Sequence, residues 1–314
     1  MIFLTYRCNL SCPYCFSKGQ SGEFPIDRVL DLVEWAQANG VRAISFCGGE
    51  PTIYPGFSRV LDRLRHLGLK AYFATNLLAD QGTMKWITPE HVDMVVVHVA
   101  HREVYAKGQW DRLIANLKQA KAAGVSIALR FSAYSPDHDW SHLFSLIEET
   151  ELRRVRFALA FPAAGRDNAY VRLADFERMA LTVLHLQAQC ESMGVEFGLA
   201  KPVPLCLFPE DAQTRMVRWP GYTSLCNIFE DGFTRNACVS PGERVSPCLG
   251  IPSVDWLLSE SSDWESLSRF CRCHIAPILD RPLFERCSEC FLYERRLCQG
   301  ACLGHKMEML QCGS

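Results

Sequence analysis

The sequence predicts an α/β fold built on parallel strands, followed by an irregular cysteine-rich segment. Short apolar runs alternate with amphipathic stretches over about the first 200 residues, and glycines end several of the amphipathic stretches. From Cys206 onward the chain is instead rich in Pro, Gly and Cys. We therefore expect two domains, over residues 1–200 and 201–314.

The α/β part is expected to contain six strands, most of them followed by a helix. The strands are expected at 2–6, 42–47, 70–75, 92–99, 125–131 and 155–159, and the helices at 25–38, 57–67, 110–123, 140–149 and 174–193. Strands separated by helices pair in parallel through right-handed crossovers. The first helix has apolar residues at helical spacing and stops at Gly40.

Composition describes an ordinary globular protein in a reducing compartment. The chain has 314 residues, 48% of them hydrophobic, and a net charge of -2. These values give no indication of nucleic-acid binding or of a membrane span. Arg7 and Cys8 interrupt the only early apolar stretch, so we expect no signal peptide and a cytoplasmic protein. The 16 cysteines are therefore expected to be metal ligands more often than disulfides.

Three cysteines follow the first expected strand. Cys8, Cys12 and Cys15 have the spacing C-x3-C-x2-C. Three thiolates leave one iron of a 4Fe–4S cluster without a protein ligand, and that iron can bind a substrate or cofactor. The alternatives are a zinc knuckle or buried free thiols. A zinc site needs a fourth ligand, and no His or Cys follows within a short loop.

A glycine pair follows the second expected strand. Gly48-Gly49-Glu50-Pro51 comes directly after the apolar run 43–47. Two glycines at a strand end let the backbone approach a ligand closely. In this order and at this separation, the two motifs resemble those of the radical S-adenosylmethionine (SAM) enzymes. In that family the open iron chelates the amino and carboxylate groups of SAM, and the glycine motif binds its amino group.

The resemblance implies a partial (β/α)6 TIM-like barrel, open on one side, with its chemistry at the carboxyl ends of the strands. It implies cofactor-binding roles for Gly48, Gly49, Glu50, Pro51, Asn76 and Arg130. Arg130 is expected to bind a carboxylate of SAM or of the substrate, or else to pair with an acid. No catalytic residue is singled out.

The fourth expected strand departs from the family pattern. Many relatives place a serine against the cofactor ribose there, whereas this chain has His98 and His101. They either contact the cofactor or substrate or, as we expect, are neutral histidines bonded to backbone groups.

The C-terminal cysteines resemble the SPASM extension of radical SAM enzymes, which holds two auxiliary iron–sulfur clusters. The phrase 240–248 reads as a turn and short hairpin that delivers Cys248. The resemblance assigns Cys226, Cys238, Cys248 and Cys302 to the first cluster, and Cys287, Cys290, Cys298 and Cys312 to the second.

The gap between Cys290 and Cys298 is two residues longer than usual, which a loop can absorb without loss of a ligand. Cys238 is the least secure ligand because its spacing from Cys226 is unusual, and the first cluster has an open iron if Cys238 is not a ligand. A structural zinc domain is the competing interpretation. The remaining cysteines are expected to pack or to be spare thiols, although a C-x-C pair can bind metal: Cys47, Cys190, Cys206, Cys271 and Cys273.

The implied activity is that of an oxidoreductase in which a 5′-deoxyadenosyl radical takes hydrogen from an unactivated C–H bond. The expected substrate is a peptide that becomes cross-linked or oxidised. The alternative is a sugar, aminocyclitol or tetrapyrrole precursor, and Arg130, Arg154, Arg156 and Arg166 would suit an anionic one unless they are simply solvated. A non-catalytic electron carrier is disfavoured, because a carrier has no use for a cofactor-binding glycine turn.

The expected partners, besides the substrate, are an electron donor such as flavodoxin or ferredoxin and a separate leader-binding protein. The latter is the alternative to docking of the leader on this chain itself, because we expect no leader-binding domain before Cys8.

Overall fold

The computed structural model describes residues 1–41, 43–226, 229–230, 233–234, 237–252, 254–255 and 263–312. Within these ranges, the side chains of 229–230, 233–234, 254–255 and 310–312 are not described. Arg42, at the start of the expected second strand, and the side chain of Cys312 therefore lie outside the description.

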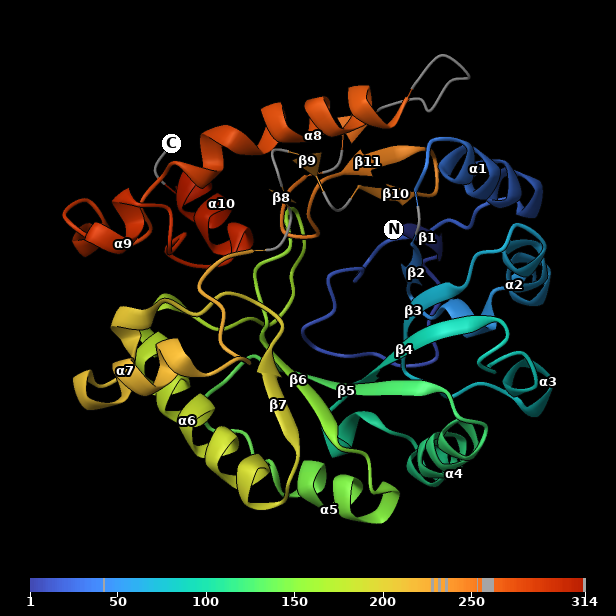
Figure 1. The fold of residues 1–314 in the computed structure, drawn as a ribbon, viewed down its shortest axis with the longest axis horizontal. Helices are drawn as coiled ribbons and strands as arrows, with labels where there is room; N and C mark the ends of the chain where they lie inside the picture. Colours follow the sequence, from blue (N-terminus) through green and yellow to red (C-terminus); the bar gives the residue numbers. More distant parts are fainter. Residues whose placement is uncertain are drawn as a thin grey trace.

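Parallel strands form an open barrel (Figure 1). The strands are β1 (Ile2–Thr5), β2 (Ile44–Gly48), β3 (Ala71–Thr75), β4 (Val92–Val99), β5 (Ser126–Ala133), β6 (Arg154–Leu159) and β7 (Glu196–Leu199). Each pairs in parallel with the next along the chain. The predicted α/β architecture is confirmed, with one strand more than expected. Strand β7 was missed because its sequence Glu-Phe-Gly-Leu contains a charged residue and a glycine and forms no apolar run.

Helices cover the convex side of the sheet (Figure 1). They are α1 (Ile26–Ala38), α2 (Phe57–His66), α3 (Gln81–Met84), α4 (Gln109–Ala122), α5 (Ser141–Thr150) and α6 (Phe176–Ser192), and α7 (Glu210–Arg218) follows β7. Short 3-10 turns η1 (Pro51–Ile53), η2 (Arg102–Val104), η3 (Leu173–Asp175) and η4 (Leu205–Leu207) lie in the connections.

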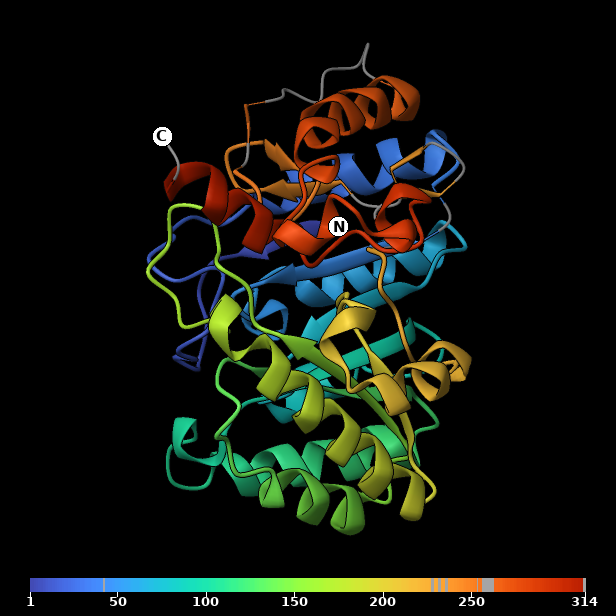
Figure 2. The same cartoon turned by 90° about the vertical axis from the view of Figure 1, so that its left-hand side faces the viewer.

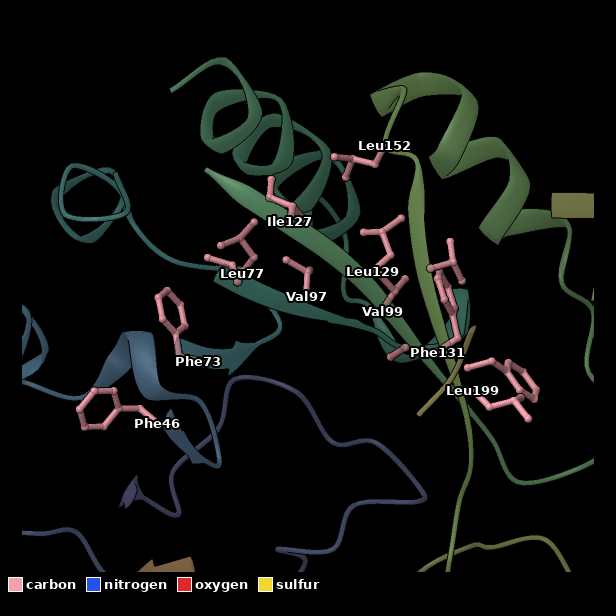
Figure 3. Packing of buried hydrophobic residues seen from close by; sticks show 14 of the residues in the cluster. Phe46, Phe73, Leu77, Val97, Val99, Ile127, Leu129, Phe131, Leu152 and Leu199 are labelled. Carbon is pink, nitrogen blue, oxygen red and sulfur yellow. The ribbon is translucent and has the colours of Figure 1, made fainter. Parts of the chain in front are cut away.

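The main core lies between strands and helices, as Figure 3 shows for Phe73, Val97 and Phe131. Side chains alternate between the two faces of a strand. Val97 and Val99 belong to this core, so His98 faces the barrel interior. Arg130 is its register partner on β5 and faces the same way. The polar side chains of His98 and Arg130 therefore face the inside of the barrel.

The C-terminal segment continues the barrel sheet past β1. Strand β10 (Cys238–Ser240) pairs in parallel with β1, and β11 (Arg244–Ser246) and β12 (Val254–Asp255) follow antiparallel. The hairpin predicted over 240–248 is therefore present. The remaining elements are β8 (Phe229–Glu230), β9 (Phe233–Thr234), α8 (Trp264–Leu279), η5 (Glu285–Cys287), α9 (Phe291–Glu294) and α10 (Leu303–Cys312).

Helices α8 and α10 pack against each other above the barrel (Figure 2). The boundary near residue 200 stays a prediction. Among the described helices, none has the length and apolar character that crossing a membrane requires.

Candidate functional site

The glycine pair packs against the strand that leads into the cysteine loop. The Gly49 N–H donates to Thr5 O at 2.7 Å, and the Glu50 N–H donates to Arg7 O at 2.8 Å. A Cβ atom would lie 2.2 Å from Thr5 O at Gly48, whose φ is +144°, and 2.1 Å from Arg7 O at Gly49. Both positions therefore require glycine, because the backbone before Cys8 occupies the space of a side chain.

The Glu50 side chain connects three elements. One carboxylate oxygen accepts hydrogen bonds from the Thr52 N–H at 3.0 Å and from the Thr52 and Thr75 hydroxyls, each at 2.6 Å. The other accepts from the Asn76 N–H at 2.6 Å. Burial raises the pKa of Glu50, while these donors act in the opposite direction. Glu50 thus fixes the ends of β2 and β3 relative to each other, and its oxygens point at the protein.

Each sulfur of the cysteine loop receives hydrogen bonds. Cys8 Sγ accepts from the Leu10 N–H at 3.5 Å and from Asn76 Nδ2 at 3.8 Å. The Tyr14 hydroxyl donates to Cys12, and backbone N–H groups of Ser17 and Lys18 donate to Cys15.

These donors make the three cysteines of the loop suitable cluster ligands. Burial raises the pKa of Cys8 to about 11 and that of Cys12 to about 12. Donors to sulfur stabilise thiolates, which are the form that binds iron. The donor set therefore fits a cluster on this loop.

The His98 side chain contacts Tyr14 of the cysteine loop. Its Nε2 lies 3.0 Å from the Tyr14 hydroxyl, which itself donates to Cys12. Burial, with the neighbouring Arg130 charge, lowers the pKa of His98 to about 3, so the ring is neutral. The neutral state agrees with expectation, but the expected backbone partner is wrong for His98. The physical reason is that Tyr14, which lies between Cys12 and Cys15, extends to His98 on β4 and takes the place of a backbone partner.

His101 lies in a group of aromatic rings at the same end of the barrel. Its ring centroid is 3.8 Å from that of His138 and 5.4 Å from that of Tyr134. A hydrogen bond with the Ser132 backbone agrees with the expectation of a backbone-bonded histidine. Tyr134 and His138 were missed from sequence, because isolated aromatic residues in loops carry no recognisable spacing.

Arg130 lies in the barrel interior, where burial lowers its pKa and the thiols of Cys47 and Cys302 act in the opposite direction. Its Nε is buried and has no hydrogen-bond partner among the described residues. A half-buried arginine whose Nε is buried without such a partner is suited to bind an anionic group.

Two further arginines of the strands are paired with an acid. Arg154 and Arg156 both pair with Glu196, and Arg154 and Glu196 begin the neighbouring strands β6 and β7. Their charges are therefore offset by an acid of β7, a strand that sequence patterning missed, and their role toward an anionic substrate stays a prediction. Arg166 instead lines a hollow with Tyr6, Phe16 and Cys238.

Three C-terminal cysteines share one local geometry. The Gly250 N–H donates to Cys248 Sγ at 3.4 Å, and the Gly300 N–H donates to Cys298 Sγ at 3.3 Å. The Gly304 N–H likewise donates to Cys302. A Cβ at Gly250 would lie 2.7 Å from Gly304 Cα, so the turns after Cys248 and Cys302 pack directly against each other. Such N–H donors again suit thiolate ligands.

Lys201, which no sequence pattern singled out, lies near Cys226, Cys248 and Cys302, three of the cysteines assigned to the first auxiliary cluster. Lys201 Nζ lies 5.0 Å from the centroid of the Phe161 ring. Burial by itself would lower the pKa of Lys201, but Cys302, Cys248 and Cys226 outweigh it and raise the pKa. The cation therefore lies near the three thiols and offsets negative charge there.

Cys238 lies on β10 at the edge of this group. It is buried with Phe3 and Cys47, and burial raises its pKa to about 11. Cys248 and Lys201 also act on it. Of the remaining thiols, Cys190 and Cys271 are buried and Cys273 is exposed on α8.

The second group contains Cys287, Cys290 and Cys298, with Cys206 beside them. In the described part of the chain, no three or more His, Cys, Asp or Glu side chains are arranged to hold a single metal ion. A 4Fe–4S cluster binds each thiolate to a different iron, which spreads its ligands further than one tetrahedral zinc does.

Taken together, these features define an open α/β barrel with a three-thiol loop at the carboxyl ends of its strands. Residues 2–148 match the family model of the Radical SAM superfamily, so this part of the chain is a radical SAM domain. The resemblance drawn from the two motifs is thereby confirmed for this region, and the domain implies a 4Fe–4S cluster and SAM as its cofactors.

Known proteins similar to this chain include two curated relatives. Fe-coproporphyrin III synthase of Methanosarcina barkeri is 27% identical over 49% of this chain and 42% of its own length. PqqA peptide cyclase of Gluconobacter oxydans is 27% identical over 49% of this chain and 47% of its own length. The chain thus spans less than half the length of these relatives.

A solved structure extends the likeness of the fold to the C-terminal segment. Streptococcus suis SuiB, bound to its precursor peptide SuiA, superposes with a TM-score of 0.67 at 19% identity. The superposition covers 96% of this chain and 70% of SuiB.

Proposed function

We propose that this protein is a radical SAM oxidoreductase that modifies a peptide. The observation that carries the proposal is the three-thiol loop, whose sulfurs all accept hydrogen bonds at the mouth of the barrel. A 4Fe–4S cluster and SAM together supply a 5′-deoxyadenosyl radical, which takes a hydrogen atom from an unactivated C–H bond.

Cys8, Cys12 and Cys15 would hold the SAM-binding cluster. Gly48, Gly49 and Pro51 would present backbone groups to the cofactor. Glu50 and Asn76 contribute by position: the carboxylate fixes the two strand ends, and the Asn76 amide reaches Cys8. Arg130, with its free buried Nε, would bind the carboxylate of SAM.

The C-terminal cysteines would hold two auxiliary clusters. Cys226, Cys238, Cys248 and Cys302 form the first set, and the packed turns after Cys248 and Cys302 support it. Cys287, Cys290 and Cys298 belong to the second, with Cys312 as the ligand that the resemblance implies. Lys201 offsets the charge of the first set, which favours an electron-accepting role for it.

A small hollow of about 70 Å³ lies between the cysteine loop and the C-terminal segment, with room for part of a substrate side chain. It is lined by Tyr6 and Phe16 of the loop, Arg166 after β6, and Cys238 and Leu249 of the C-terminal segment. Relatives named for peptide chemistry, PqqA peptide cyclase and peptide-bound SuiB, favour a peptide.

A tetrapyrrole precursor is the second candidate. The likeness to Fe-coproporphyrin III synthase favours it, and Arg130 and Arg166 could contact its carboxylates. An electron donor such as flavodoxin or ferredoxin would reduce the clusters. A leader-binding protein would be required if the peptide is presented by a leader.

We place the protein in the cytoplasm as part of this proposal, because cysteines that bind iron–sulfur clusters persist as thiols in a reducing compartment.

The proposal is tested by 5′-deoxyadenosine production from SAM under anaerobic reduction. The purified protein should form it, the Cys12→Ala variant should not, and Cys273→Ala, which removes an exposed thiol, should match the unaltered protein. Mass spectrometry with a candidate precursor peptide and with coproporphyrin then separates the two substrates. Absence of 5′-deoxyadenosine from a fully iron-loaded protein would contradict the proposal.

A further inference from the structure

The 3-10 turn η4 (Leu205–Leu207) is held firmly by the end of the barrel. Leu207 and the following Phe208 are buried in the main core. The Val203 N–H donates to Thr223 O at 3.0 Å, and the Tyr222 hydroxyl donates to Val203 O at 2.9 Å. Cys206 therefore has a fixed backbone, while its side chain remains only half-buried.

The same turn contacts the second cysteine group directly. Arg286, next to Cys287, donates through Nη1 to Cys206 O at 3.3 Å and through Nη2 to Glu177 Oε1 at 3.2 Å. The Leu205 N–H donates to the Cys298 sulfur. Two independent hydrogen bonds thus join η4 to the segment that contains Cys287 and Cys298.

Two thiols of the second group, those of Cys287 and Cys298, lie close to Gly300. Its N–H donates to Cys298 Sγ at 3.3 Å, and a Cβ at this glycine would lie 3.7 Å from Cys287 Sγ. The Cys290 N–H donates to Cys287 O at 3.2 Å, which folds Cys287 and Cys290 into one turn.

The electrostatic surroundings of Cys206 point to the same group. Burial raises the pKa of the Cys206 thiol, Arg286 lowers it, and Cys287, Cys298 and Cys290 raise it. By contrast, burial is the sole cause of the raised pKa of Cys190, about 11. Cys206 thus interacts with all three described thiols of the second group.

We propose that Cys206 supplies the fourth thiolate of the second auxiliary cluster, in the place that the resemblance gives to Cys312. This inference rests on the proposed function, because it requires that the C-terminal segment holds iron–sulfur clusters. With Cys206 of η4 as a ligand, the cluster would connect the end of the barrel to the C-terminal segment. With four thiolates, every iron of the cluster has a protein ligand, which suits electron transfer rather than substrate binding.

Alkylation of the intact, iron-loaded protein tests the proposal without any substitution. Iodoacetamide labelling followed by peptide mass spectrometry should find Cys206 protected, and chelation of the iron should expose it. Cys273 should be labelled in both states, because its thiol is exposed. Labelling of Cys206 as fast as Cys273 in the iron-loaded protein would overturn the inference.

Iron content supplies the second test, in a Cys8/Cys12/Cys15→Ala background that leaves only auxiliary clusters. Cys206→Ala should lower the iron from about eight per chain to between about four and about seven, whereas Cys312→Ala and Cys273→Ala should not. If Cys312→Ala loses iron and Cys206→Ala does not, Cys312 is the ligand and the inference fails. If the background variant holds no iron at all, the proposed auxiliary clusters fail instead.

Discussion

The Glu50 carboxylate accepts a hydrogen bond of 2.6 Å from the Asn76 N–H, so the end of β2 is tied to the end of β3. The Asn76 side chain in turn donates to Cys8 Sγ at 3.8 Å. The buried Glu50 is therefore linked to Cys8 of the cysteine loop through Asn76. Glu50 acts on the proposed cluster by positioning this loop.

Replacement of this acid should weaken both the fold and the cluster. In Glu50→Gln, one carboxylate oxygen becomes an amide donor that faces a donor, either Asn76 N–H or the Thr52 and Thr75 groups. We expect a loss of about 1–3 kcal/mol in the free energy of unfolding, because a buried donor is left unpaired. Denaturant unfolding of the iron-free protein measures it.

The control for Glu50 is Glu34→Gln, which removes an exposed ion pair with Arg63. That variant should change stability by less than about 1 kcal/mol. Equal effects of the two variants would contradict the role given to Glu50.

Substitution of Gly49 should displace the cysteine loop. In Gly49→Ala the added Cβ would lie 2.1 Å from Arg7 O. This oxygen belongs to the backbone and cannot rotate away as a flexible side chain could. We expect a destabilisation of about 1–3 kcal/mol together with lower occupancy of the cluster on Cys8, Cys12 and Cys15. Iron content and unfolding measure the two effects.

Gly165→Ala is the control for Gly49. Its φ is +67° and an added Cβ meets nothing within 4 Å, so only backbone strain of about 1–2 kcal/mol is expected, with iron binding unchanged. Normal iron content in Gly49→Ala would show that the loop tolerates the displacement.

His98 should make the fold less stable as the pH falls. Its folded pKa is lowered to about 3, so below the unfolded pKa of about 6.5 the unfolded chain binds a proton that the folded chain does not. Stability is therefore lost progressively as the pH falls from about 6.5 toward 3. In His98→Gln, the loss between about pH 7.5 and 5.5 should be smaller by about 1 kcal/mol.

Unfolding of the iron-free protein at the two pH values measures this difference. His185→Gln, at an exposed position, serves as the control and should keep the full pH dependence. An unchanged pH dependence in His98→Gln would contradict the neutral, buried state of this ring.

Two lysines should tune the two proposed auxiliary clusters separately. Lys201 lies near Cys302 and Cys248, whereas Lys306 lies near Cys287 and Cys298 and donates to Leu279 O at 2.8 Å. Removal of a nearby cation makes an added electron less favourable, so Lys201→Met should lower the midpoint potential of the first cluster only. Lys306→Met should lower that of the second only.

Redox titration followed by electron paramagnetic resonance resolves the two potentials. Each variant is the control for the other. A shift of both potentials, or of neither, in both variants would contradict the assignment of one lysine to each group.

Local patterns were sufficient to predict most of the fold. Helical spacing of apolar residues located α1 and α2, and the turn before Cys248 predicted a hairpin that the structure contains. These features depend on neighbours in sequence. Strand β7 was missed because its four residues, Glu-Phe-Gly-Leu, form no apolar run. The acid Glu196, which pairs with Arg154 and Arg156, was missed with it.

Long-range contacts could not be predicted in the same way. The motif indicated that Gly49 is required, but that the Arg7 backbone fills its side-chain space follows only from the pairing of β1 with β2. Lys201 and Cys206 are far in sequence from the cysteines that lie near them in the structure. Neither residue belongs to a motif. Their places depend on how the C-terminal segment folds back onto the barrel.

The central claim is that this chain holds one cofactor-binding cluster and two auxiliary clusters. Iron and labile sulfide should be measured after anaerobic purification, beside the Cys8/Cys12/Cys15→Ala variant, with zinc measured in parallel. We expect about twelve irons per chain, falling to about eight in the variant. About four irons falling to zero, with zinc present in both, would contradict the account of the C-terminal cysteines, and no iron after reconstitution would contradict it entirely.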